Sequence, residues 1–327
     1  MMRKFFLPFA MLVAFGFASL PTQSASAGDF IDLDLSGVAP GTRNIFLQAE
    51  QFWESRINGY SNSLPQGVRS QLTGRLAITA QTIPIDGVGG ILGQAGPTGF
   101  AQTATTVGNP ANGRSFLTTA VTSGIMSFDV ADAGRDDFAR TVLHEMGHVL
   151  GIGTLWELNG IVNANGTERG LLQQRNGLFQ YIGRDGLRGF REESGHHRAN
   201  YVPTENFGGP GTALGHWAGG TSPNWFFAPA NVSRVELLTG FATSAPTFVA
   251  EATFGALADV GWSVNGFNEN EGTFGSGPAP FGGPTFSPFP KSGRGFTFNQ
   301  VAAVPEPSSA VVLIAGMMGL FVRRKRA

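Results

Sequence analysis

TVLHEMGHVLGIGTLW, residues 141–156, places two histidines four residues apart, with a glutamate directly after the first. On an α-helix, side chains four residues apart project from one face about a turn apart, so His144 and His148 can bind one metal ion. Glu145 then lies beside the metal, where it can act as the general base of a hydrolytic reaction. The HExxH pattern therefore predicts a metal site with Glu145 as its catalytic residue.

The residues around this motif predict that it lies on a helix. Apolar residues recur at helical spacing, at Phe138, Val142, Met146, Val149 and Leu150. Asp136 and Asp137 precede this run, where negative charge favours a helix N-terminus, and Gly151 and Gly153 end it. Burying two imidazoles on such a helix without a partner is costly, which favours metal binding over an ordinary helix.

A zinc enzyme of this type needs a third protein ligand. In the extended pattern HExxHxxGxxH, a glycine turns the chain and a histidine three residues later completes the site. Here Gly151 is present, but Thr154 stands at the position of that histidine. The chain has no cysteine, so only histidine and carboxylate remain as strong ligands. The remaining histidines are His196, His197 and His216.

Two alternatives compete with His216 on the residues alone. His196 and His197 are adjacent on a polar loop, REESGHHRAN, and histidines in such loops are more often solvated. A downstream glutamate such as Glu157 or Glu192 is the other alternative, and we find no helical pattern that supports either one.

A longer series of motifs resembles the leishmanolysin-like metzincin proteases. The series is HEMGHVLGIGTLW, a long insertion, VPTENFGGPGTALGHW, VELLTGF and ALADVGW, and it covers about residues 123–262. In that family an insertion separates the glycine of the helix motif from the third histidine, which precedes a tryptophan. The resemblance implies that His216 completes the zinc site with His144 and His148, and that residues 152–215 are the insertion. It also implies one catalytic Zn²⁺.

Two residues depart from the metzincin pattern. Metzincins have a methionine turn under the metal, and the matching stretch Glu236–Gly240 carries Leu238 at the methionine's place. Leucine is apolar and similar in volume, and such exchanges usually cost less than ~1.5 kcal/mol. Some metzincins place a tyrosine just after the turn, where Phe241 offers no hydroxyl. Tyr201 is then a candidate to stabilise the oxyanion.

The remaining globular residues predict an α+β fold. Residues 43–57, RNIFLQAEQFWESRI, have a helical apolar stripe that predicts an early amphipathic helix. Residues 75–85 and 123–132 contain short alternating stretches that predict strands. Residues 87–102 are glycine-rich without the order of a nucleotide-binding loop, and we predict a surface loop. With the resemblance, we expect a zincin-like catalytic domain over residues 28–265, with a twisted sheet and an active-site helix.

Two further predictions concern the strand near Ile125–Val130 and the aspartates beyond it. By the zincin resemblance, this strand is the sheet edge along which an extended peptide would pair. The stretch SFDVADAGRDD carries Asp129, Asp132, Asp136 and Asp137. Clustered carboxylates can bind Ca²⁺, but the EF-hand order is missing, so we favour a solvated loop and helix start.

The N-terminus predicts export from the cytoplasm. Residues 1–27 combine a basic start, an apolar run over residues 5–20 and an A-x-A site at residues 25–27. These are the parts of a secretory signal peptide, and a short membrane anchor is the alternative. The mature protein is then expected outside the cytoplasm, from residue 28 onward.

The C-terminus predicts a sorting signal behind a linker. Residues 266–303 are rich in glycine, proline and phenylalanine without a period, so we predict a linker, or an extension whose phenylalanines pack on the domain. Residues 304–327 contain VPEP, an apolar segment at residues 309–322 and a basic cluster, and resemble a PEP-CTERM tail. That resemblance implies an exosortase as partner, transient membrane association through residues 309–322 and a bacterial cell-surface location. A permanent anchor is the alternative.

Together these features predict a secreted, surface-sorted zinc-dependent endopeptidase that acts on protein or peptide substrates. A net charge of −1 gives no basic field for nucleic acid. A non-catalytic surface or matrix protein with a structural zinc is the main alternative, and hydrolysis of an amide in a cell-wall peptide is another. Glu145 favours an enzyme, because a purely structural site needs no base.

Overall fold

The computed structural model describes residues 30–106, 114–163, 166–209, 211–219, 235–240, 247–265, 267–268 and 273–274. The expected signal peptide and sorting segment lie outside these residues, as does most of the expected linker. In the part of the chain that is described, no helix combines the length and apolar character needed to cross a membrane. The fold is mixed α and β, which confirms the predicted α+β class.

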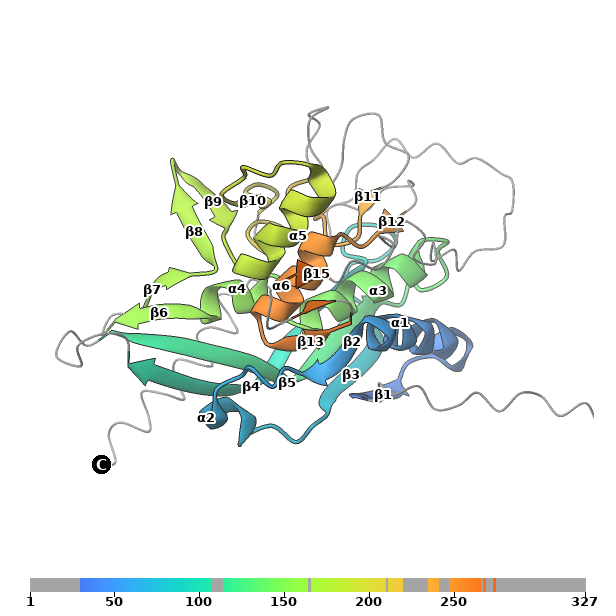
Figure 1. Cartoon of the computed structure of the whole chain (residues 1–327). Coiled ribbons are helices and arrows are strands. Elements are labelled where there is room, and N and C mark those ends of the chain that lie inside the picture. The colour runs from blue at the N-terminus through green and yellow to red at the C-terminus, as the bar shows by residue number, and fades with distance from the viewer. Residues whose placement is uncertain are drawn as a thin grey trace, which may run out of the picture.

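A six-stranded sheet forms the base of the molecule (Figure 1). Its strands are β1 (Ile31–Gly37), β3 (Leu76–Ile83), β4 (Gly93–Thr106), β5 (Ser115–Asp129), β6 (Gly160–Asn163) and β7 (Gly166–Gly170). Strands β1, β3 and β5 are parallel, whereas β4 runs antiparallel to β5. Strand β4 pairs only with β5 among the described strands, so β4 forms an edge of the sheet.

The prediction that Ile125–Val130 is the sheet edge is wrong. Ile125 of β5 pairs with Thr79 of β3 on one side and with Gly96 of β4 on the other. The main-chain groups of this strand are therefore already used on both sides, and the edge position belongs to β4.

Strand β4 also corrects the predicted surface loop at residues 87–102. Only the first part of that range is loop, and the chain is extended from Gly93 to Thr106. Glycine and proline argue against a strand locally, but an edge strand tolerates Pro97, and the register shifts between Pro97 and Gly99. Its thirteen paired positions with β5 outweigh the weak local preference.

Two helices lie on one face of the sheet, α1 (Arg43–Arg56) and α3 (Phe138–Val149) (Figure 1). Both confirm the helices predicted from apolar spacing. Helix α1 buries Phe46, Ala49 and Trp53, and the Trp53 indole donates a hydrogen bond to the Leu143 carbonyl at 3.2 Å. This bond ties α1 to α3 one residue before His144. Every residue of α3 except Arg140 is buried, so the HExxH motif lies in the core.

The segment between α3 and His216 is itself folded. It contains α4 (Thr154–Leu158), β6, β7, a three-stranded sheet of β8 (Leu172–Arg175), β9 (Leu178–Tyr181) and β10 (Val202–Pro203), and α5 (Arg184–Ser194). The other elements are η1 (Pro40–Thr42), β2 (Ile57–Tyr60), α2 (Gln66–Arg69), β11 (Val235–Glu236), β12 (Thr247–Phe248), α6 (Glu251–Asp259), β13 (Trp262–Val264), β14 (Phe267–Asn268) and β15 (Thr273–Phe274). Strand β2 pairs with β13, and β11 pairs with β12.

Helix α5 packs directly on α6, which fixes this segment to the rest of the domain (Figure 1). The approach is close enough that a Cβ atom at Gly255 would lie 2.3 Å from the Asp185 carbonyl oxygen. Asp259, at the end of α6, accepts hydrogen bonds from the backbone N–H groups of Asp185 and Gly186 at the start of α5. It also accepts the hydroxyl of Tyr181 at 2.8 Å.

We expect Asp259 to make the domain less stable as the pH rises from 5 to 8. Burial, with a contribution from the charge of Asp185, raises the pKa of Asp259 from 3.8 to about 7. From pH 5 up to about pH 7 the unfolded carboxyl is ionised while the folded one still holds its proton, so rising pH favours unfolding, and the effect levels off above pH 7 as the folded carboxyl ionises. The loss should be on the order of 2–3 kcal/mol between pH 5 and pH 8.

Urea denaturation of wild type and Asp259→Asn at both pH values measures this effect. The asparagine variant is less stable overall but should lose less stability between pH 5 and pH 8. Equal changes in the two proteins would contradict the assignment, because any other titrating group acts alike in both.

Candidate metal centre

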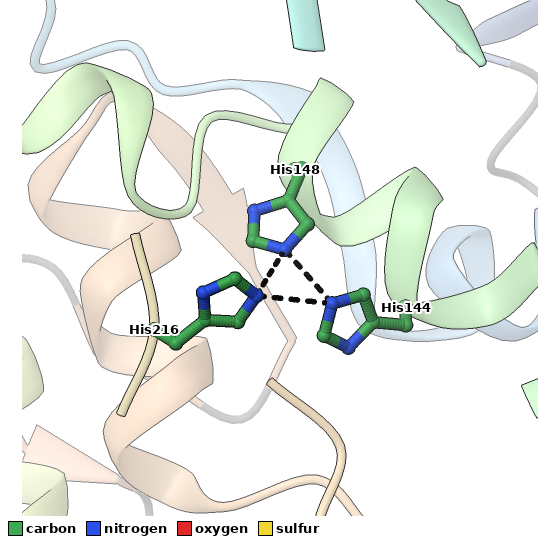
Figure 2. Close-up of side chains that lie close together, drawn as sticks. All are labelled: His144, His148 and His216. Atoms are coloured by element: carbon green, nitrogen blue, oxygen red, sulfur yellow. Dashed lines mark hydrogen bonds between the residues drawn. The ribbon is translucent and has the colours of Figure 1, made fainter. Parts of the chain in front are cut away.

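Three imidazoles converge in the core, and Figure 2 shows them facing one another. The Nε2 atom of His148 lies 3.0 Å from Nε2 of His144 and 3.1 Å from Nε2 of His216, and the third side of the triangle is 3.2 Å. All three side chains are buried. Across the described ranges, this is the one group of three or more side chains that could hold a metal ion.

The other ring nitrogen of each histidine is occupied by a backbone carbonyl. Nδ1 of His144 donates to the Leu237 carbonyl at 2.7 Å. His148 donates to Ile152 at 3.0 Å, and His216 to Thr212 at 2.9 Å. A neutral imidazole has one donor and one acceptor nitrogen, so these bonds leave a lone pair on every Nε2. The three lone pairs point toward one another.

Burial keeps these rings neutral. It lowers the pKa of His216 to about 4 and the pKa values of His144 and His148 well below the usual 6.5. Neutral imidazole is the form that binds a metal ion. Three acceptor nitrogens at this separation repel one another unless a cation lies between them, so the burial and the tautomers both suit a metal site.

The spacing of the nitrogens fits a metal ion. Ligands about 2.0–2.1 Å from a tetrahedral zinc ion lie about 3.3 Å from each other. The observed separations of 3.0–3.2 Å are slightly shorter, and a shift of a few tenths of an ångström closes the difference. Three histidines also leave the fourth position of a tetrahedral ion for another ligand. The group can therefore hold a metal ion.

Glycines allow the loop with His216 to approach α3. Gly153 follows the helix with φ at +82°, and a Cβ there would lie 2.7 Å from the Cα atom of Gly215. On the other side, a Cβ at Gly240 would lie 2.5 Å from Cγ2 of Thr212 and 3.4 Å from Cγ of His216. Larger residues at Gly153 or Gly240 would push the third imidazole away from the other two.

Leu238 packs against α3, the helix that carries His144 and His148. It is fully buried, and a Cβ atom at Gly147 would lie 3.1 Å from its Cδ1 atom. Leu238 therefore contacts α3 between the two turns that carry His144 and His148. Phe241, the residue expected to replace a tyrosine, lies outside the described residues.

The Glu145 side chain lies next to the start of the edge strand β4. It is fully buried on α3, one residue after His144. A Cβ atom at Gly93, the first residue of β4, would lie 3.1 Å from its Cγ and 3.2 Å from its Oε1. Any residue larger than glycine at position 93 would therefore crowd the Glu145 carboxylate.

The structure does not bring the alternative ligands to this site. His196 and His197 are exposed beyond the end of α5, and the His196 ring stacks on Phe190. Glu157 and Glu192 lie on α4 and α5, so the expectation that neither has a helical context is wrong. Neither glutamate joins the three-histidine group.

Tyr201, the candidate to stabilise an oxyanion, lies next to β10 and is partly buried. Its suggested role remains a prediction.

Two of the four aspartates, Asp129 at the end of β5 and Asp132 after it, are held inside the protein, whereas Asp136 is exposed, as predicted. Asp129 and Asp132 are buried, which corrects the predicted solvated loop at these positions. Asp129 accepts hydrogen bonds from the N–H groups of Ala131, Ile85, Asp86 and Gly87. These bonds, that of Ala131 first, lower its pKa. They fix the loop before β4, and no carboxylate group suited to Ca²⁺ is found among the described residues.

Sequence reasoning gave no role to Glu236, although its carboxylate is fully buried behind the site. It accepts hydrogen bonds from the Leu238 N–H and the Thr253 hydroxyl. Burial raises its pKa to about 7. A charged residue inside the apolar run VELL is the signal that could have indicated a buried, hydrogen-bonded carboxyl.

The fold and the site define an α+β protein with a buried three-histidine group that could hold a metal ion. No family model matches the chain, and comparison with curated proteins finds no match either. The function must therefore be argued from the arrangement of its own residues.

Proposed function

We propose that this protein is a zinc-dependent endopeptidase of the metzincin type. The observation that carries the proposal is the buried triangle of Nε2 atoms from His144, His148 and His216, two of them within an HExxH helix. The turn at Leu238, packed against Gly147, supports the metzincin assignment because the methionine turn occupies that place in the family.

The three histidines and Glu145 have separate roles in this proposal. A zinc ion held by the three Nε2 atoms would polarise the substrate carbonyl and lower the pKa of a water molecule toward ~7. Glu145 would accept a proton from the attacking water and return it to the leaving nitrogen of the peptide. The hydrogen bonds from Nδ1 to backbone carbonyls hold each ring in the tautomer whose Nε2 is a ligand.

Strand β4 gives the substrate a place to bind. It is an edge strand, and its first residue, Gly93, contacts Glu145. An extended peptide can add to such an edge through main-chain hydrogen bonds, which would lay it beside the proposed general base. A sheet edge next to a buried glutamate is not needed at a structural zinc site, so this arrangement favours the endopeptidase over the non-catalytic alternative.

The sequence patterns at the two ends of the chain support a proposed location for the protein. The signal-peptide pattern of residues 1–27 and the PEP-CTERM-like tail of residues 304–327 support export and sorting to the bacterial cell surface. An exosortase is the proposed partner at the tail, and residues 309–322 are the proposed transient membrane contact.

Removal of the metal tests the proposed function. We expect the purified protein to cleave casein or gelatin, and a chelator to slow cleavage by at least about 10²-fold, because zinc supplies several kcal/mol of stabilisation to the transition state. Zn²⁺ added back should restore the rate. Cleavage is measured with fluorescently labelled casein, and metal content with atomic emission.

Either of two results would contradict the proposed endopeptidase activity. One is full activity after the metal has demonstrably left, and the other is no cleavage by zinc-loaded protein of any unfolded protein or peptide tried. The second result favours a structural zinc.

A further inference from the structure

Glu236 lies behind the metal centre and closes the turn that supports His144. Its Oε2 accepts a hydrogen bond from the backbone N–H of Leu238. Between these two residues is Leu237, whose carbonyl accepts Nδ1–H of His144 at 2.7 Å. The carboxylate therefore fixes the short turn that presents this carbonyl to the imidazole.

The second oxygen of Glu236 reaches the support of His216. Oε1 accepts the hydroxyl of Thr253 at 2.7 Å, and Oγ1 of Thr253 accepts the indole N–H of Trp217 at 2.8 Å. Trp217 follows His216 directly, and its backbone N–H donates to the Leu238 carbonyl at 3.0 Å. One buried side chain thus connects to two of the three imidazoles, from elements distant in sequence.

A buried carboxyl at this place is costly unless it has a specific use. Glu236 is fully buried, and taking such a group from water costs several kcal/mol before its hydrogen bonds offset the loss. An apolar side chain could fill the same space without that cost. An apolar side chain could not, however, accept hydrogen bonds from both the Leu238 N–H in the turn and the Thr253 hydroxyl on α6.

We propose that Glu236 is a positioning residue of the metal centre, which holds His144 through Leu237 and His216 through Thr253 and Trp217 in the orientation that binds the ion. The proposal rests on the metal-binding half of the proposed function and is independent of proteolysis. The alternative is a purely structural carboxyl that joins β11 to the start of α6, where it also accepts the N–H of Ala250.

Metal affinity separates the two roles. Zinc dissociation constants are measured by competition with a chromophoric chelator, and site geometry by the visible spectrum of the Co²⁺-loaded protein. We expect Glu236→Ala to bind zinc about 10–100-fold more weakly, the usual effect of removing a group that orients a ligand. Its Co²⁺ spectrum should change. Glu236→Gln has the same shape and can still accept from the Leu238 N–H, but its amide nitrogen cannot accept from Thr253, so it should recover only the part of the affinity that depends on the Leu238 bond.

Asp259→Asn is the matched control. Asp259 is another buried carboxyl of raised pKa, and it supports α5 rather than an imidazole. This variant should lower the midpoint of urea denaturation and leave zinc affinity and the Co²⁺ spectrum of the folded protein unchanged. The proposal is overturned if Glu236→Ala binds zinc as wild type does, if the control loses as much affinity, or if Glu236→Gln is no better than the alanine variant.

A second variant covers the case in which Glu236→Ala does not fold. Thr253→Val keeps the shape of the side chain and removes only the arm to Trp217, so it should weaken zinc binding while Thr253→Ser does not. Unchanged affinity in Thr253→Val then overturns the proposal. Because these measurements use the metal alone, a wild-type protein that binds zinc without cleaving any peptide leaves their outcome intact.

Discussion

His216→Ala should abolish stoichiometric zinc binding and, with it, proteolysis, whereas His197→Ala should change neither. The alanine variant removes the nitrogen that lies 3.1 Å and 3.2 Å from the other two. Two histidines on one helix then remain. The binding free energy of a structural zinc site with four ligands is about 10–16 kcal/mol. An equal share for each ligand is about 3 kcal/mol, so the loss of one ligand should weaken zinc binding at least about 10²-fold.

Metal analysis after dialysis against a weak chelator measures this prediction, with circular dichroism to show that each variant is folded. His197 is a suitable control because it is an exposed histidine on the same chain. Full zinc content and full activity in His216→Ala would refute the assignment of His216. Loss of zinc in His197→Ala would indicate instead that the exposed histidines His196 and His197 bind the metal.

The elements with a strong local pattern were predictable. Helices α1 and α3 have apolar residues at regular helical spacing, and β5 alternates over part of its length. Each pattern reflects burial of one face, or of nearly the whole helix in α3, so the sequence alone carries the information. The sequence of β4 has no such pattern, because glycines and Pro97 stand where β-branched and aromatic residues are typical of a strand. Its pairing with β5 decides its conformation.

The site was only partly predictable, for the same reason. The spacing of His144 and His148 is local, so the helix motif predicts their common face. The position of His216 depends on the close approach of Gly153 to Gly215, a contact across 62 residues that no periodicity encodes. It came from a family resemblance and not from the residues alone. Asp129 and Glu236 were missed because their backbone N–H donors lie in loops and turns whose course the sequence does not show.

Glu145→Gln should lower the rate of peptide hydrolysis on the order of 10²–10⁴-fold while zinc stays bound. Glutamine has the shape of glutamate, so it should keep the contact with Gly93 that the buried carboxylate makes at the start of β4. It cannot accept the proton of the attacking water at neutral pH. The loss should therefore appear in kcat, with little change in KM and none in zinc affinity, since the three imidazoles remain.

A lower kcat with unchanged zinc affinity distinguishes a general base from a structural group. The test measures kcat and KM for a quenched fluorescent peptide, and zinc content on the same samples. Glu145→Asp is an informative companion, because it keeps a carboxylate but withdraws it by one methylene from the substrate. We expect it to retain more activity than the glutamine variant if proton transfer is the role of Glu145. The loss of a general base lowers the rate by more than about tenfold. If Glu145→Gln keeps activity within about tenfold of wild type, another residue must be the general base. A parallel loss of zinc would instead give Glu145 a role in the architecture of the site.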